Sequence, residues 1–197
     1  MPTQANPSLT TVDWSRIPAP NDDGAARHLA GMAIADIALH ATDGSNVSLA
    51  RLSGRTVVFA YPRTGQPGKL GLVDDWDQIP GARGCTPQSC AFRDQNRDIL
   101  AAGADRLYGL STQDTAYQRE AVDRLHLPFP LLSDADLAFT HAMRLPTMSV
   151  AGQTLLKRMS WIVDDGRITA VQYPVFPPDR NAADVLAWLA ANPRTRS

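Results

Sequence analysis

Two cysteines five positions apart are the residues of this 197-residue chain best suited to do chemistry. Cys85 and Cys90 lie in the stretch GCTPQSC, where a predicted strand and loop lead into the start of a predicted helix. Free backbone N–H groups and the helix dipole favour a thiolate there, and lower a cysteine pKa from about 8.5 into the range of about 3.5 to 7.5. The thiolate is the nucleophilic form, so the position of Cys85 predicts a reactive thiol. Three arginines are candidates to add positive charge beside it: Arg83, Arg93 and Arg158.

The spacing of the cysteines has a mechanical consequence. Residues i and i+5 of a regular α-helix are about 8.6 Å apart at Cα, whereas a disulfide requires a separation below about 7 Å. If Cys85 and Cys90 pair, the first turns of the helix must unwind, so the oxidised and reduced forms should differ in shape. The alternative is that Cys90 is a small buried core residue and Cys85 an incidental thiol.

Composition disfavours several other classes of protein. The net charge of −1, from 19 basic and 20 acidic residues, gives no basic surface for nucleic acid or an anionic membrane. Two cysteines are too few for a disulfide-stapled secreted fold. The four histidines occur singly, and the acidic run at 74–77 lacks an adjacent ligand set, so no metal site is expected. With neither a signal-peptide pattern nor an apolar run of membrane-spanning length, we expect a cytoplasmic protein.

The N-terminal half contains the elements that must position Cys85. Residues 1–30 show no regular hydrophobic period and predict an irregular arm. A short hairpin around residues 42–44 leads into a buried strand at 56–61. Residues 63–82, with four glycines and two prolines, predict a long loop insertion. The next helix is expected from about Pro87 to Ala102, with Thr86 as its N-cap.

The C-terminal half alternates strands and helices and then ends in a hairpin and a helix. The hairpin turns at Asp165-Gly166, a pair typical of short β-turns. Together the elements predict one α/β domain over 31–192, with a mixed sheet flanked by helices and a tail at 193–197; this is compatible with a thioredoxin-like fold. The predicted ranges are strands at 106–110, 130–132, 159–163 and 168–173, and helices at 115–125, 135–143 and 181–191.

The stretch GCTPQSCAFRD at 84–94 resembles the GCTxxxCxFRD motif of the Q-type peroxiredoxins, also called bacterioferritin comigratory proteins. Three further segments resemble that family in the same order: the strand that ends in Tyr-Pro at 61–62, LSD at 132–134, and RMSWIVD at 158–164. The resemblance covers roughly residues 31–192. It implies a thioredoxin-like fold and thiol-dependent reduction of peroxides.

The resemblance also implies a role for individual residues. Cys85 would be the peroxidatic cysteine, Cys90 the resolving one, Arg158 the support for the thiolate and the peroxide oxygens, and Pro62 a shield for the pocket. A sulfenic acid on Cys85 would condense with Cys90 to an intrachain disulfide. A thioredoxin-like or glutaredoxin-like reductant would then restore the thiols. The cycle requires no metal, flavin or haem, and the protein would be a monomer or a weak dimer.

The chain departs from the family pattern at the active site. In the family motif PxxxTxxC, proline and threonine precede the cysteine by seven and three residues, but Gln78 and Ala82 occupy those positions here. Pro62 is displaced upstream, and Thr64 follows it by two residues rather than four. Either Thr64 folds back to donate the hydroxyl contact, or the contact is missing. Trp161 replaces the family's phenylalanine and is expected in the core.

Two function classes follow from these residues. The first is a thiol peroxidase for hydrogen peroxide and organic hydroperoxides. The second is a redox sensor or holdase-like binding protein that uses the same cysteine pair without efficient turnover. A general disulfide oxidoreductase is disfavoured, because the spacing is C-x4-C rather than C-x-x-C.

Overall fold

A mixed seven-stranded sheet forms the centre of the protein in a computed structural model, which describes residues 12–194. Its strand order is β2-β1-β5-β4-β3-β8-β9. The three central strands, β3 (Arg55–Ala60), β4 (Arg106–Ser111) and β5 (Leu131–Ser133), are parallel. Every residue of β3 is buried, as the uninterrupted run of β-branched and apolar residues from Thr56 to Ala60 predicts, and Arg55 at its start pairs with Asp164. The loop that follows β3 therefore starts from a rigid strand.

Antiparallel hairpins complete the sheet at both edges. β8 (Met159–Asp164) pairs with β3 on one side and with β9 (Arg167–Gln172) on the other. Both turn residues of this hairpin have positive φ, 47° at Asp165 and 77° at Gly166, which is the geometry of a tight type I′ turn. At the other edge, β1 and β2 form the hairpin predicted around residues 42–44. Their bounds are Leu39–Ala41 for β1 and Asn46–Val47 for β2.

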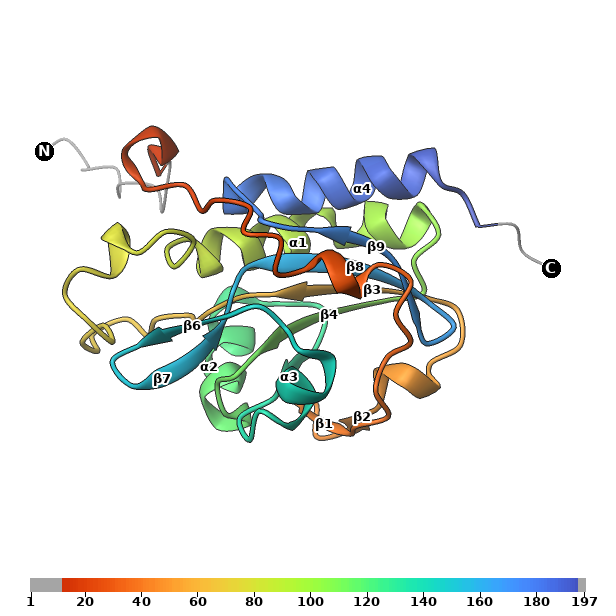
Figure 1. Cartoon of the computed structure of the whole chain (residues 1–197), viewed down its shortest axis with the longest axis horizontal. Helices are drawn as coiled ribbons and strands as arrows, with labels where there is room; N and C mark the ends of the chain where they lie inside the picture. Colours follow the sequence, from red (N-terminus) through yellow and green to blue (C-terminus); the bar gives the residue numbers. More distant parts are fainter. Residues whose placement is uncertain (1–11, 195–197) are drawn as a thin grey trace, which may run out of the picture.

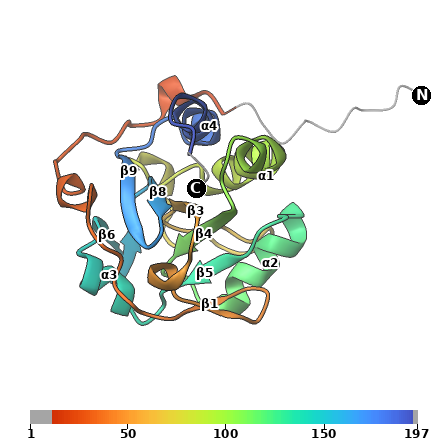
Figure 2. The same ribbon diagram turned by 90° about the vertical axis from the view of Figure 1, so that its right-hand side faces the viewer.

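Helices cover both faces of the sheet (Figures 1 and 2). The first face carries α1 (Cys85–Ala101), α2 (Thr115–Leu125) and α4 (Asn181–Ala191), and α1 packs along α4. The other face carries α3 (Ala138–Met143) and the chain before β1, which contributes Ala26, Leu29 and Ile34 to the core. The predicted mixed sheet with flanking helices is therefore confirmed. Within the described residues, no helix has the length and apolar character of a membrane span.

The core on the α1 face fixes where the active-site helix lies. Phe92 of α1 stacks on Phe59 of β3, with ring centroids 4.3 Å apart. Cys85 belongs to the same buried cluster, together with Tyr61. The predicted core position of Trp161 is also confirmed, since it lies on the opposite face of the sheet, beside Phe139. The start of α1 is thus anchored to the end of β3 by aromatic packing.

The N-terminal arm is more ordered than predicted in its described part. Residues 1–11 lie outside the described residues, but short 3-10 turns form at Trp14–Arg16 and Arg27–Leu29. Ala26 and Leu29 are buried and belong to the core of the α3 face. The arm predicted to end at residue 30 therefore contributes to the core. The sequence did not indicate this contribution, because the apolar side chains near 26–29 are too few to show a regular hydrophobic period.

Two further segments refine the predicted organisation. The insertion at 63–82 contains one regular element, the 3-10 turn Trp76–Gln78. A separate hairpin of β6 (Thr147–Val150) and β7 (Gln153–Leu156) was not predicted. Its turn includes Ala151 at φ 47°, and alanine is not a residue that signals a left-handed turn. Of the predicted tail, residues 195–197 lie outside the described residues.

Candidate active site

The helix that carries the cysteines begins at Cys85, two residues earlier than the predicted start at Pro87. Its N-cap is Gly84 with φ 107°, and no side chain caps the helix, so the predicted Thr86 cap is wrong. A Cβ atom on Gly84 would lie 2.5 Å from Cγ of Pro178 and 2.8 Å from the ring of Trp14. Only glycine fits this conformation and this space. The close packing of Gly84 against Pro178 and Trp14 fixes the start of α1, so Cys85 lies in its first turn.

Two N–H groups point at the sulfur of Cys85, whose residue is only 4% exposed. Nη2 of Arg158 lies 3.3 Å from Sγ, and the backbone N of Arg63 lies 3.4 Å from it. The protonated thiol donates to the carbonyl of Ala82 at 3.6 Å. The sulfur therefore faces one side-chain donor and one backbone donor. The structure therefore brings Arg158 to Cys85, as the resemblance implies.

Sequence reasoning missed the contribution of Arg63. Its contact with sulfur is made by the backbone N–H, which carries no side-chain signature. The Arg63 guanidinium instead lies over the ring of Tyr117, 4.7 Å from its centroid. The one available signal was position, because Arg63 lies three residues after the end of the buried strand β3.

Several acceptors hold the Arg158 side chain, which is 2% exposed. The two N–H groups of Nη2 are shared between Sγ and the carbonyls of Gly81 at 3.3 Å, Ala82 at 3.1 Å and Arg83 at 3.1 Å. Nη1 donates to Oε1 of Gln88 in α1. The loop before the helix and the helix itself thus fix one guanidinium. This arrangement presents Nη2 to the sulfur in a single orientation.

A buried polar chain continues from Gln88 to the C-terminal helix. Gln88 Nε2 donates to Oδ1 of Asn181 at 2.8 Å, and both residues are almost fully buried. Asn181 Nδ2 donates in turn to Ser160 Oγ at 2.9 Å and to Gln172 Oε1 at 2.8 Å. The chain ties the first turn of α1 to α4, β8 and β9. Sequence reasoning assigned no role to Gln88 or Asn181.

The hydroxyl of Thr64 does not form the expected contact with the thiol. Thr64 is buried, and its Oγ1 donates to Oε1 of Gln113 at 3.1 Å. Its backbone N donates to the same oxygen at 2.9 Å, and Gln113 Nε2 donates back to the Thr64 carbonyl at 3.2 Å. Thr64 therefore holds the start of the insertion against the end of β4. The second of the two sequence alternatives, a missing hydroxyl contact, is the one observed.

A cavity of about 250 Å³ opens in front of Cys85. Its wall is largely built by the insertion and the loop before α1, through Trp76, Asp77 and Arg83. Asp77 pairs with Arg83, so these two side chains form part of the rim together. Pro62 is buried and is not among the residues that line this cavity, so its shielding role stays a prediction.

Cys90 lies one and a half turns further along α1, and both cysteines are free thiols. Burial raises the pKa of the Cys90 thiol, and the nearby charge of Arg93 lowers it in part. Arg93 pairs with Asp94 at 2.8 Å and donates to the carbonyl of Leu125 at 2.9 Å. It therefore caps the end of α2 beside Cys90 and does not reach Cys85.

Comparison with known proteins matches this chain over most of its length. A family model described as Redoxin matches residues 29–186. A chloroplastic peroxiredoxin Q of Oryza sativa subsp. japonica is 30% identical over 189 residues, which cover 92% of this chain and 78% of that protein. A protein named as a peroxiredoxin from Mycobacterium tuberculosis is 35% identical over 138 residues, which cover 68% of this chain and 77% of that protein.

Solved structures show the same fold. The crystal structure of peroxidoxin BcpB from Mycobacterium tuberculosis superposes with a TM-score of 0.66 at 25% identity, covering 84% of this chain and 98% of that one. Peroxiredoxin Q from Xanthomonas campestris superposes with a TM-score of 0.61 at 23% identity, covering 80% of this chain and 91% of that one. These likenesses confirm the predicted thioredoxin-like architecture.

Proposed function

Since the chain belongs to the Redoxin family and, within it, to the Q-type peroxiredoxins, which are thiol-dependent peroxidases, we propose that it reduces hydrogen peroxide and organic hydroperoxides through a Cys85–Cys90 disulfide. One observation carries the proposal. The sulfur of Cys85 lies at the start of α1 between the Arg158 guanidinium and the Arg63 backbone N–H, beside a cavity that admits a small molecule.

The first step is attack of the Cys85 thiolate on the terminal oxygen of the peroxide. A sulfur–oxygen bond forms, the O–O bond breaks, and the departing alkoxide or hydroxide takes a proton to leave as alcohol or water. Sulfur is oxidised to a sulfenic acid and the peroxide is reduced. Arg158 and the Arg63 N–H stabilise the negative charge on the reacting atoms, in the manner of an oxyanion hole.

The second step joins the two cysteines. The Cys90 sulfur attacks the Cys85 sulfenic sulfur, a disulfide forms, and the sulfenic oxygen leaves as water. Cys85 and Cys90 belong to one regular helix, so their Cα atoms are about 8.6 Å apart before the step. That separation exceeds the disulfide limit of about 7 Å, and the first turns of α1 must unwind.

The third step restores the thiols. A dithiol protein of the thioredoxin or glutaredoxin class attacks the disulfide, passes through a mixed disulfide, and leaves oxidised. Such reductants maintain free thiols in the cytoplasm, and we place the protein there. We also expect a monomer or a weak dimer, as the family resemblance implies.

Peroxide consumption tests the proposal, with thioredoxin and its reductase supplied and with glutaredoxin as a second donor. We expect sustained turnover by the wild type, none by Cys85→Ser, and a single oxidation event in Cys90→Ser unless a small thiol replaces the resolving step. A wild type that stops after one equivalent with every dithiol donor would instead support the redox sensor alternative.

A further inference from the structure

The N-terminal arm packs on the residue that begins the active-site helix. The half-buried Trp14 ring lies against Gly84, the N-cap of α1, where a Cβ atom would approach the ring to 2.8 Å. The same ring meets Phe176 edge-on, with centroids 6.0 Å apart, and Trp14 Nε1 donates to Asp179 Oδ2 at 2.8 Å. Trp14 is thus fixed by the segment at 176–179 and covers the start of α1.

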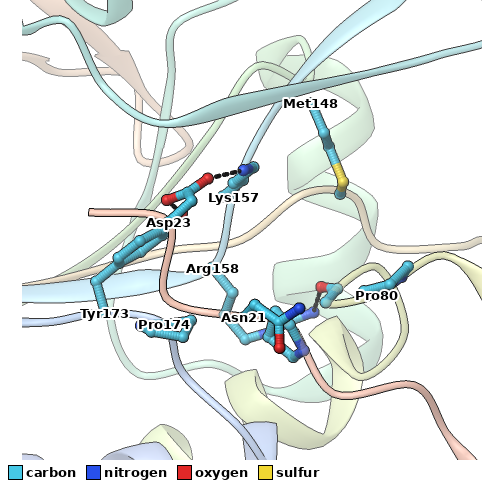
Figure 3. A pocket seen from close by; sticks show the side chains of 10 residues that line it. Asn21, Asp23, Pro80, Met148, Lys157, Arg158, Tyr173 and Pro174 are labelled. Atoms are coloured by element: carbon cyan, nitrogen blue, oxygen red, sulfur yellow. Dashed lines mark hydrogen bonds and ion pairs between the residues drawn. The ribbon is translucent and has the colours of Figure 1, made fainter. Parts of the chain in front are cut away.

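A second anchor fixes the arm at Asp23. Its carboxylate accepts from Lys157 Nζ at 2.6 Å and from the Tyr173 hydroxyl at 2.7 Å, and Figure 3 shows the three side chains together. Part of the arm between the two anchors lines a cavity of about 220 Å³. The arm is therefore held mainly at its two anchors. We call residues 14–23 the strap.

The disulfide step must move the residue that the strap covers. Cys85 and Cys90 are too far apart in a regular helix to pair, so the first turns of α1 must unwind. Beyond Cys90 the helix is anchored by the stacking of Phe92 on Phe59, so the first turn is the part that can move. Gly84 is bonded to Cys85, and unwinding therefore takes Gly84 out of its N-cap conformation and away from the Trp14 ring.

We propose that Trp14 is a positioning residue for the disulfide step. The strap holds the first turn of α1 in its helical form while Cys85 reacts with peroxide, and its Trp14 end is released when Cys85 pairs with Cys90. The redox state of the two thiols is thereby coupled to the position of the N-terminal arm. This inference rests on the Cys85–Cys90 disulfide of the proposed function.

The response of the strap is measured without peroxide. Diamide takes two electrons and two protons from the two thiols and leaves the Cys85–Cys90 disulfide. The chain has four tryptophans, so protein labelled with 5-fluorotryptophan gives four fluorine NMR signals, and Trp14→Phe assigns one of them. We expect the Trp14 signal to shift on oxidation and to gain sensitivity to the exchange of H₂O for D₂O. The signal of the core residue Trp161 should stay unchanged, and diamide-treated Cys90→Ser should keep the reduced spectrum.

Single-turnover kinetics test the effect of Trp14 on the reaction. After one equivalent of peroxide, Trp14→Leu should form the disulfide at least about fivefold faster, the factor given by loss of one ordinary hydrogen bond. Trp14→Phe keeps a ring on Gly84 and loses only the bond to Asp179, so it should be about twofold faster. Oxidation of Cys85 should change by no more than about twofold in both variants, because its two N–H donors remain.

Trp188→Leu is the matched control for the loss of a half-buried tryptophan. Trp188 lies toward the C-terminal end of α4, where its ring centroid is 5.3 Å from the Arg55 guanidinium. This variant should lose stability and leave the rate of the disulfide step unchanged. Equal acceleration by Trp188→Leu, an unchanged rate in Trp14→Leu, or a Trp14 signal that does not respond to the disulfide would each overturn the proposal.

The two measurements separate this inference from the peroxidase activity. A protein whose Trp14 signal responds to diamide but that does not consume peroxide would refute the proposed function and leave the strap standing. Sustained peroxide turnover with an unresponsive Trp14 would refute the strap alone. If diamide formed no intrachain disulfide, both the proposed disulfide step and the strap would be refuted.

Discussion

The two cysteines of α1 have opposite surroundings, although five positions separate them. Cys85 in the first turn is buried against two N–H donors, Arg158 Nη2 and Arg63 N. Cys90 has no hydrogen bond to its thiol among the residues that the structure describes, and burial raises its pKa. The sulfur of the first turn thus has hydrogen-bond donors, whereas burial disfavours the ionised form of the thiol in the second turn. In the proposed cycle, the first sulfur attacks peroxide and the second attacks only after the first has been oxidised.

The comparison also shows where the positive charge at Cys85 comes from. Arg93 is adjacent to the cysteines in sequence, yet it pairs with Asp94 and caps α2. Arg158 directly precedes β8, the strand next to β3 in the sheet, and reaches the sulfur. Position along the chain is therefore a poor guide to which arginine serves the thiolate, and the fold decides it.

Substitution of Arg158 should have the largest effect on the reactivity of Cys85. In Arg158→Met we expect the second-order rate constant for oxidation by hydrogen peroxide to fall by about 100-fold, the size of effect typical for loss of one preorganised donor. Competition kinetics in a Cys90→Ser background isolates this step. Arg158→Lys is the matched control, because it keeps the positive charge but loses the fixed geometry of the guanidinium donors. Its rate constant should lie between those of the wild type and Arg158→Met. A decrease of less than tenfold in Arg158→Met would refute the assigned role.

The raised pKa of Cys90 predicts how the disulfide step depends on pH. The attacking form is the thiolate, so below that pKa the rate of disulfide formation should rise about tenfold per pH unit. Because burial raises the pKa above its ordinary value, we expect the increase to continue past the pH at which a free cysteine levels off. Quenched single-turnover samples, resolved by mass spectrometry after one equivalent of peroxide, measure this step.

Two controls keep this measurement specific. Cys90→Ser should form no intrachain disulfide at any pH. A wild-type rate that does not change between neutral and alkaline pH would mean that unwinding of α1, rather than ionisation of Cys90, limits the step.

Gln88 lies between the two cysteines in α1 and connects Arg158 to Asn181. It accepts from Arg158 and donates to Asn181, so Gln88→Leu should leave two buried partners unsatisfied. We expect Cys85 oxidation to slow about fivefold, since one hydrogen bond is worth about 1 kcal/mol. We also expect the disulfide step to accelerate, because the first turn loses a contact that opposes its unwinding. Asn181→Leu removes the hydrogen bond between Gln88 and Asn181 but keeps the one between Arg158 and Gln88. It should therefore accelerate the disulfide step with less effect on the oxidation of Cys85.

Rapid-quench measurement of both steps separates these outcomes. Equal slowing of oxidation and disulfide formation by Gln88→Leu would point to general destabilisation instead of a link between the two turns. Chemical unfolding of each variant gives the accompanying loss of stability.

Much of the fold was predictable because it depends on local patterns. The last helix at 181–191 and the hairpin at Asp165-Gly166 were predicted from an apolar period and from a turn pair that tolerates positive φ. The β6–β7 hairpin was missed because its turn places Ala151 in the left-handed region, which the residue type does not signal. The start of α1 was misplaced for a related reason, since Gly84 caps it through backbone conformation alone.

The site was predictable only where a side chain carries a recognisable role. Both cysteines and Arg158 could be selected from motif position. The Gln88–Asn181 bond joins residues 93 positions apart, and no local pattern reveals such a pair. The Arg63 contact uses a backbone N–H, which any residue except proline would supply. Long-range polar pairs and backbone donors are therefore the parts of the site that required the structure.

The smallest effect on Cys85 oxidation is expected from substitution of Thr64, because its hydroxyl does not form the contact with sulfur that the family pattern suggests. Its hydroxyl donates to Gln113 and not to sulfur, so Thr64→Val should change the rate of Cys85 oxidation by no more than about twofold while lowering the free energy of unfolding by about 1 kcal/mol. Thr64→Ser keeps the hydroxyl and is the matched control for both measurements. A tenfold slower oxidation in Thr64→Val, with Thr64→Ser unaffected, would show that the hydroxyl turns to the sulfur during the reaction. The Cys85 surroundings would then have a third donor, and the contrast with Cys90 would be greater than the resting structure shows.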